Sequence, residues 1–70
     1  MRLTMKQWRL MKGKTQEQLA LECGVHRNTY ASWEENPEKI TIENAKKVSK
    51  ALGESIDDIF FTKETLQNVE

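Results

Sequence analysis

Residues 15–34, TQEQLALECGVHRNTYASWE, contain two short helical patterns separated by a single glycine. Thr15 and Gln18 have the spacing of a capping box, in which the threonine oxygen accepts a hydrogen bond from an amide of the first turn. A helix is therefore predicted to begin directly after Thr15. Gly24 suits the left-handed conformation that ends a helix, because it has no Cβ. A second helix is predicted after it, so the two helices meet at a very tight corner.

Three residues of this corner have the properties that a helix-turn-helix requires. Ala20 provides a small side chain where the second helix crosses the first, and Gly24 provides the left-handed turn. Val25 provides an apolar side chain that can dock the turn into the core. This arrangement holds the second helix out from the surface of the domain.

Similar signals predict three further helices. Gly13 and Gly53 each follow an apolar periodic segment, and Pro37 must separate two helical runs. Thr4, Thr41 and Ser55 stand where N-caps are expected. The five predicted helices cover residues 5–12, 16–23, 27–35, 42–52 and 56–60. No useful strand-like alternation is present, so the predicted fold is all-α, a compact five-helix bundle.

Apolar residues recur at helical spacing in every predicted helix, as in helices that bury one face. The expected core comprises Met5, Trp8, Met11, Leu19, Ala20, Cys23, Val25, Tyr30, Trp33, Ile42, Ala45, Val48, Leu52, Ile56, Ile59 and Phe60. Tyr30 is expected to belong to the core with its hydroxyl at the rim.

Length and composition indicate the number of domains and the cellular compartment. The chain has 70 residues, which predicts one domain over residues 1–61 and a polar tail over residues 62–70. Eleven basic and eleven acidic residues cancel, although residues 1–14 carry basic residues and no acid. The lone Cys23 excludes an internal disulfide and suits a reducing compartment. With no apolar run long enough for a membrane span and no signal peptide, a cytoplasmic location is expected.

The sequence resembles the Cro and repressor-type helix-turn-helix family of phage and bacterial regulators. Four segments carry the resemblance: TQEQLA at residues 15–20, CGV at 23–25, WE at 33–34 and ALGESIDDIF at 51–60. The resemblance covers residues 3–61 and implies a five-helix domain like that of the lambda repressor. It also implies a cytoplasmic homodimer that binds double-stranded DNA at a palindromic operator, with the third helix in the major groove.

The resemblance to the family implies base-reading roles for three residues of the third helix. Arg27 can hold guanine O6 and N7 together, and Asn28 can do the same for adenine N6 and N7. Ser32 lies one turn further along the same face. Without the family context, Arg27 would be read as a solvated surface charge.

The same resemblance suggests contacts to the DNA backbone. Gln16 opens the second helix, where its amide and the helix N-terminus can hold a phosphate. Thr29 is either a phosphate contact or a polar residue of the first turn. Asn36 and Lys39 follow the third helix and are either phosphate contacts or ordinary loop residues. Lys14 resembles a basic contact before the second helix, although the family usually has an apolar residue there.

Other positions carry expectations about structure and charge. Arg9 and Glu34 match positions that form an ion pair in relatives, which ties the first helix to the end of the third. His26 stands at the N-cap of the third helix, where the family usually has Ser or Thr, so a weaker cap is expected. The acidic Glu35 and Glu38 near the expected DNA face oppose phosphate binding, unless they point away from it.

Two other patterns in the sequence could indicate a different function. Gly13-Lys14-Thr15 resembles the end of a phosphate-binding loop, but Trp8 stands where the first glycine should be. One cysteine and one histidine cannot form a usual zinc site. We therefore expect no enzyme activity, catalytic residue, metal, cofactor or membrane partner. The alternative is a protein-interaction module of the same fold, such as an antitoxin-like or regulator-binding domain.

Overall fold

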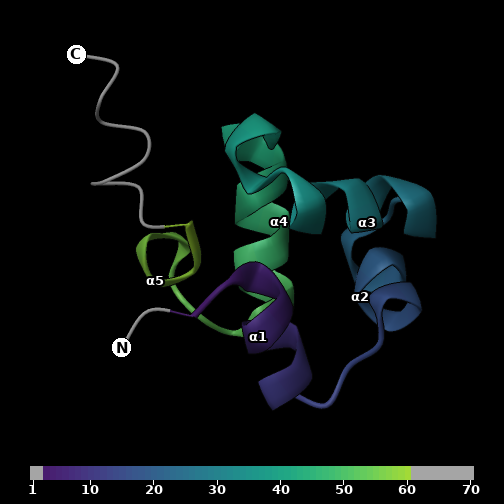
Figure 1. Ribbon diagram of the computed structural model, residues 1–70, viewed down its shortest axis with the longest axis horizontal. Coiled ribbons are helices and arrows are strands. Elements are labelled where there is room, and N and C mark those ends of the chain that lie inside the picture. Colours follow the sequence, from purple (N-terminus) through teal and green to yellow (C-terminus); the bar gives the residue numbers. More distant parts are fainter. Residues whose placement is uncertain (1–2, 61–70) are drawn as a thin grey trace.

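The computed structural model describes residues 3–60, so the predicted tail at residues 62–70 lies outside the described residues. The described chain contains five α-helices and one 3-10 turn (Figure 1). They are α1 (Met5–Met11), α2 (Gln16–Cys23), α3 (Arg27–Glu35), η1 (Pro37–Lys39), α4 (Ile42–Leu52) and α5 (Ile56–Phe60). The prediction of an all-α five-helix fold is confirmed. None of the helices within residues 3–60 has the length and apolarity to cross a membrane.

The helix ends form as the sequence predicts. The Gln18 amide donates to Thr15 Oγ1 over 3.0 Å, and the Thr15 amide donates to Gln18 Oε1 over 2.8 Å, so α2 begins with a complete capping box. Thr4 and Gln7 form the same box at α1. α1 ends at Met11, one residue earlier than predicted.

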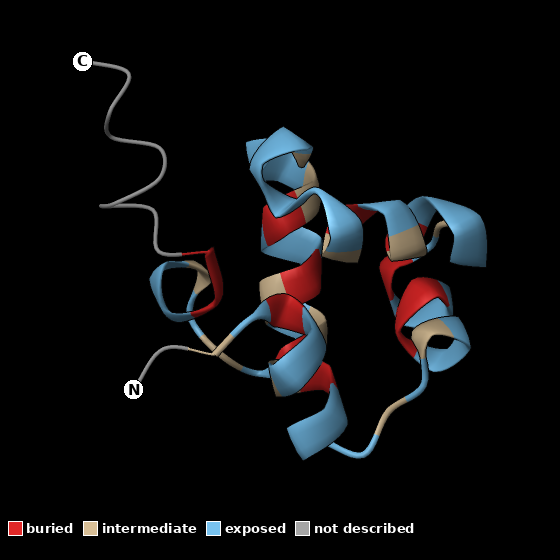
Figure 2. Cartoon of the chain, viewed as in Figure 1, coloured by how far each residue is buried: buried red, intermediate tan, exposed pale blue. Residues whose placement is uncertain are grey.

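The helices enclose one core (Figure 1). α4 stands in the middle, with α2 and α3 to one side and α5 to the other. α2 packs against both α3 and α4, while α5 packs against α1 and α4. Leu19, Tyr30 and Val48 are fully buried at the centre. Figure 2 shows the buried residues on the faces that the helices turn toward one another.

Two residues expected in the core are on the surface. Met11 is 67% exposed because the buried face of α1 is the one with Met5 and Arg9, and a residue two positions after Arg9 lies on the other side of the helix. Arg9, four residues after Met5 on the same helix face, is buried at 6% exposure. Ile42 is 49% exposed because it is the first residue of α4, ahead of the buried positions Ala45 and Val48.

The corner between α2 and α3 has the predicted geometry. Gly24 has φ +74°, in the left-handed region, and its amide donates to the Leu21 carbonyl over 3.1 Å. The Val25 amide donates to the Ala20 carbonyl over 3.0 Å, and the Val25 side chain packs against the core. Ala20 is buried at the crossing. The corner therefore fixes where α3 begins.

Candidate nucleic-acid interface

A buried ion pair joins α1 to the end of α3. Arg9 Nε donates to Glu34 Oε2 over 2.6 Å, and Arg9 Nη2 lies 3.3 Å from Glu34 Oε1. The side chains of the two residues are 7% and 5% exposed. Arg9 Nη1 also donates to the Lys14 carbonyl over 2.9 Å, so the guanidinium holds the loop between α1 and α2 as well.

Gln16 extends this network to the first turn of α2. Its Nε2 donates to Glu34 Oε1 over 2.9 Å. Burial opposes ionisation of Glu34, but the hydrogen bonds from Arg9 and Gln16 outweigh it and lower the pKa of the carboxyl. The hydrogen bond to Glu34 in turn raises the pKa of Arg9. One carboxylate thus ties the start of α2 to the end of α3, and sequence reasoning did not foresee this bond.

Tyr30 lies beneath the network. Its ring meets Trp33 edge to face, with centroids 5.9 Å apart and planes at 71°. The prediction that Tyr30 belongs to the core is confirmed, but the expected placement of its hydroxyl at the rim is wrong. The hydroxyl is buried and lies near Glu34 without the geometry of a hydrogen bond. Burial, and then Glu34, raise the pKa of the phenol.

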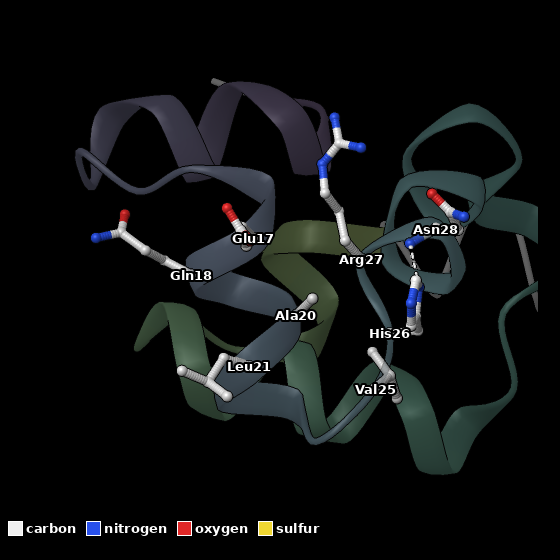
Figure 3. Close-up of a pocket in the computed structure, with 8 residues that line it drawn as sticks. All are labelled: Glu17, Gln18, Ala20, Leu21, Val25, His26, Arg27 and Asn28. Carbon is white, nitrogen blue, oxygen red and sulfur yellow. Dashed lines mark hydrogen bonds between the residues drawn. The ribbon is translucent and has the colours of Figure 1, made fainter.

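The first turn of α3 presents polar side chains beside an open groove. His26 caps the helix, because its Nδ1 accepts a hydrogen bond from the Asn28 amide over 3.3 Å. Arg27 and Asn28 are both exposed. Figure 3 shows these three side chains on one side of the groove and Glu17 on the α2 side.

A second groove joins the start of α3 to α1. Lys6 of α1, Gln16 of α2 and Arg27 of α3 all line it. Arg27 borders both grooves, so it stands where the three helices come together. Sequence reasoning did not select Lys6, although its position three residues before Arg9 and the basic N-terminal segment were available signals.

The remaining predicted contacts lie further along the chain. Ser32 Oγ donates to the Thr29 carbonyl over 2.7 Å, so the Ser32 hydroxyl hydrogen is held within α3. Both residues are exposed. Asn36 is the C-cap of α3, and Lys39 lies at the end of η1, where both are exposed.

Lys14 lines the second groove together with Gln16 and Arg27, but its ammonium is already paired. Its Nζ donates to Glu22 Oε1 over 2.8 Å and to the Ala51 carbonyl over 3.1 Å. The ammonium is therefore held between α2 and the C-terminal part of α4. Among residues 3–60, no cluster of three or more His, Cys, Asp or Glu side chains is placed to hold a metal ion.

Comparisons with known proteins agree with this geometry. The family described as Helix-turn-helix matches residues 5–59. Control protein C.BamHI of Bacillus amyloliquefaciens is 39% identical in an alignment 67 residues long, and the alignment covers 93% of this chain and 80% of that protein. No solved structure matches the chain.

Proposed function

The chain belongs to the helix-turn-helix family and is a DNA-binding regulator of transcription, and from this premise we propose that it reads a specific operator with α3 in the major groove. The observation that carries the proposal is the placement of Arg27 and Asn28. Both are exposed in the first turn of α3, and Arg27 also faces the groove shared with Gln16.

The base contacts follow from the chemistry of these side chains. A guanidinium matches the two acceptors of guanine in the major groove, and a carboxamide matches the donor and acceptor of adenine. Arg27 is therefore proposed to read guanine, and Asn28 adenine. Ser32 is proposed to accept a hydrogen bond from a base one turn further on, because its own hydrogen is held by Thr29.

Backbone contacts are proposed around this reading surface. Gln16 uses one hydrogen of Nε2 for Glu34, which leaves the second hydrogen to donate to a phosphate at the start of α2. Lys6 lines the same groove and adds a positive charge. Thr29, Asn36 and Lys39 are proposed as phosphate contacts near the start and the end of α3. Lys14 would have to leave Glu22 to join them.

We further propose that a homodimer binds a palindromic operator in the cytoplasm. One recognition helix reads only a few base pairs, so two copies on half-sites about 34 Å apart would supply the specificity. The apolar pair Phe60-Phe61 would suit a dimer contact, but Phe60 packs in the core of its own chain, and Phe61 lies outside the described residues. The dimer therefore rests on the family resemblance, and sedimentation with and without operator tests it.

The regulatory output is proposed to be repression of the phage or mobile-element type. The relative from B. amyloliquefaciens is named a control protein, which fits a regulator of gene expression. No catalytic role is proposed for any residue.

Selection of bound sequences from random DNA, followed by affinity measurements, tests the reading surface. Arg27→Ala should weaken operator binding by about 1–3 kcal/mol and relax preference at one base pair. Lys47→Ala is the matched control, because Lys47 lies on α4 and lines neither of the two grooves that Arg27 borders. An equal loss on every sequence would make Arg27 a phosphate contact. Failure to enrich any sequence would overturn the proposed operator.

A further inference from the structure

The N-cap of α3 differs in chemistry from the other capping residues of the described helices. Thr4, Thr15, Thr41 and Ser55 cap with a hydroxyl oxygen. His26 caps α3 with a ring nitrogen, and its Nδ1 accepts the Asn28 amide hydrogen over 3.3 Å. The helix proposed to read DNA is thus held at its start by an imidazole.

This hydrogen bond determines which ring nitrogen carries the hydrogen. A ring nitrogen accepts a hydrogen bond only when it is unprotonated, so the neutral ring that caps α3 must carry its hydrogen on Nε2. His26 is exposed, and it shares one groove rim with Arg27 and Asn28. The cap therefore provides an N–H donor of fixed identity beside the two proposed base-reading side chains (Figure 3).

We propose that His26 contacts the operator directly, donating its Nε2–H to a phosphate oxygen while its Nδ1 caps α3. This inference rests on the proposed function, since it requires α3 to lie in the major groove. His26 precedes the first residue of α3, so its ring lies at the flank of the reading surface, where the DNA backbone borders the groove. One ring would then both stabilise the start of α3 and hold it against the DNA.

Substitution by serine separates the two roles of the imidazole. His26→Ser keeps a capping oxygen but removes the Nε2–H donor, and the serine hydroxyl is too short to reach the position of Nε2. We expect the unfolding free energy of this variant to equal or exceed that of the wild type. Its affinity for the selected operator should fall about 3- to 10-fold, the range of one lost neutral hydrogen bond. Because a neutral donor displaces no counterion, the salt dependence of binding should not change.

His26→Ala provides the contrast, because it removes the cap as well as the donor. It should lose the same affinity and also lower the unfolding free energy. The loss in both variants should be similar on operator and on unrelated DNA, as for other phosphate contacts. A loss confined to one base pair would overturn the phosphate assignment, and wild-type affinity in His26→Ser would overturn the contact itself.

Imidazole ¹⁵N chemical shifts of the free protein at pH 8 give an independent readout that needs no DNA. They should show an unprotonated Nδ1 and a protonated Nε2. A ring with its hydrogen on Nδ1 would overturn the inference whatever the binding data show. If the wild type selects an operator and His26→Ser binds it equally well, the inference fails and the proposed function stands. If the wild type selects no sequence, the proposed function fails, and this inference fails with it.

Discussion

At the scale of single residues, Glu34 connects stability with the presentation of the DNA-binding surface. Its two oxygens accept from Arg9 and Gln16, so α1 and the start of α2 are held by one carboxylate at the end of α3. A buried ion pair of this kind is costly to break on one side, because the remaining charge loses its partner. The same bonds orient the Gln16 amide that we propose for a phosphate contact.

The lowered pKa of Glu34 predicts acid sensitivity. The unfolded chain, with a carboxyl pKa of about 4.3, binds the proton more readily than the folded one. The stabilisation is therefore complete above that value and is lost as the pH falls through the lower folded pKa. Glu34→Gln should lower the unfolding free energy at pH 7 by about 1.5–3 kcal/mol and reduce the pH dependence of stability below about pH 4. Urea unfolding from pH 7 to pH 2.5 measures both effects, and parallel pH profiles for the two proteins would contradict them.

The buried Tyr30 hydroxyl predicts a substitution that costs little. Because the hydroxyl is buried without a hydrogen-bond partner, Tyr30→Phe removes a desolvated polar group and keeps the contact with Trp33. Thermal and urea unfolding should show a free energy equal to that of the wild type or up to about 1 kcal/mol higher. A loss above about 1 kcal/mol would mean that the hydroxyl bonds to Glu34 in solution.

Residue roles could be predicted from the sequence only in part. The Arg9 and Glu34 pairing followed from the family resemblance. The bond from Gln16 to Glu34 could not be predicted, because it depends on how the start of α2 faces the end of α3. Periodicity placed Met11 in the core with Met5 and Trp8, but the buried side chains of α1 are those of Met5 and Arg9, because Arg9 is paired with Glu34.

At the scale of elements, local signals fixed almost every helix boundary. These signals are the capping boxes at Thr4 and Thr15 and the glycine at the corner. Each involves only the backbone of one or two helical turns, so the sequence was sufficient to predict where the helices begin and end. The 3-10 turn Pro37–Lys39 was missed. A single proline marks a break between helices, but the three-residue turn that begins at it depends on how α3 and α4 are joined.

A side chain at position 24 is predicted to strain the backbone without clashing with neighbouring atoms. An added Cβ would meet no atom within 4 Å, so only the left-handed backbone opposes a side chain there. Gly24→Ala should cost about 1–2 kcal/mol of unfolding free energy. Gly24→Asn should cost less, because asparagine tolerates this conformation better. Equal losses in urea unfolding of the two variants would argue against backbone strain as the cause.

At the scale of the whole molecule, the net charge is zero, but the charged side chains are unevenly distributed over the surface. Lys6, Lys14, Gln16 and Arg27 line one groove, although the Lys14 ammonium is paired with Glu22. Glu35 and Glu38 are exposed near the end of α3, close in sequence to the proposed contact at Lys39. Composition alone therefore gave no indication of a DNA partner, and the fold was needed to show which charges lie together.

This arrangement predicts how salt should affect binding. Each phosphate that a lysine neutralises releases condensed counterions, so log K falls with log salt by about 0.9 for each contact on duplex DNA. Lys6→Ala and Lys39→Ala should each lower that slope by about 1 per subunit bound and weaken binding to every sequence alike. Lys47→Ala should leave the slope unchanged, because Lys47 lies on α4 and lines neither of the two grooves beside α3. Fluorescence titrations of labelled operator between 50 and 200 mM salt, about the range over which such contacts are resolved, measure the three slopes. If Lys47→Ala changed the slope as much as Lys6→Ala, general charge attraction rather than a defined backbone contact would explain the binding, and Lys6 would leave the proposed interface.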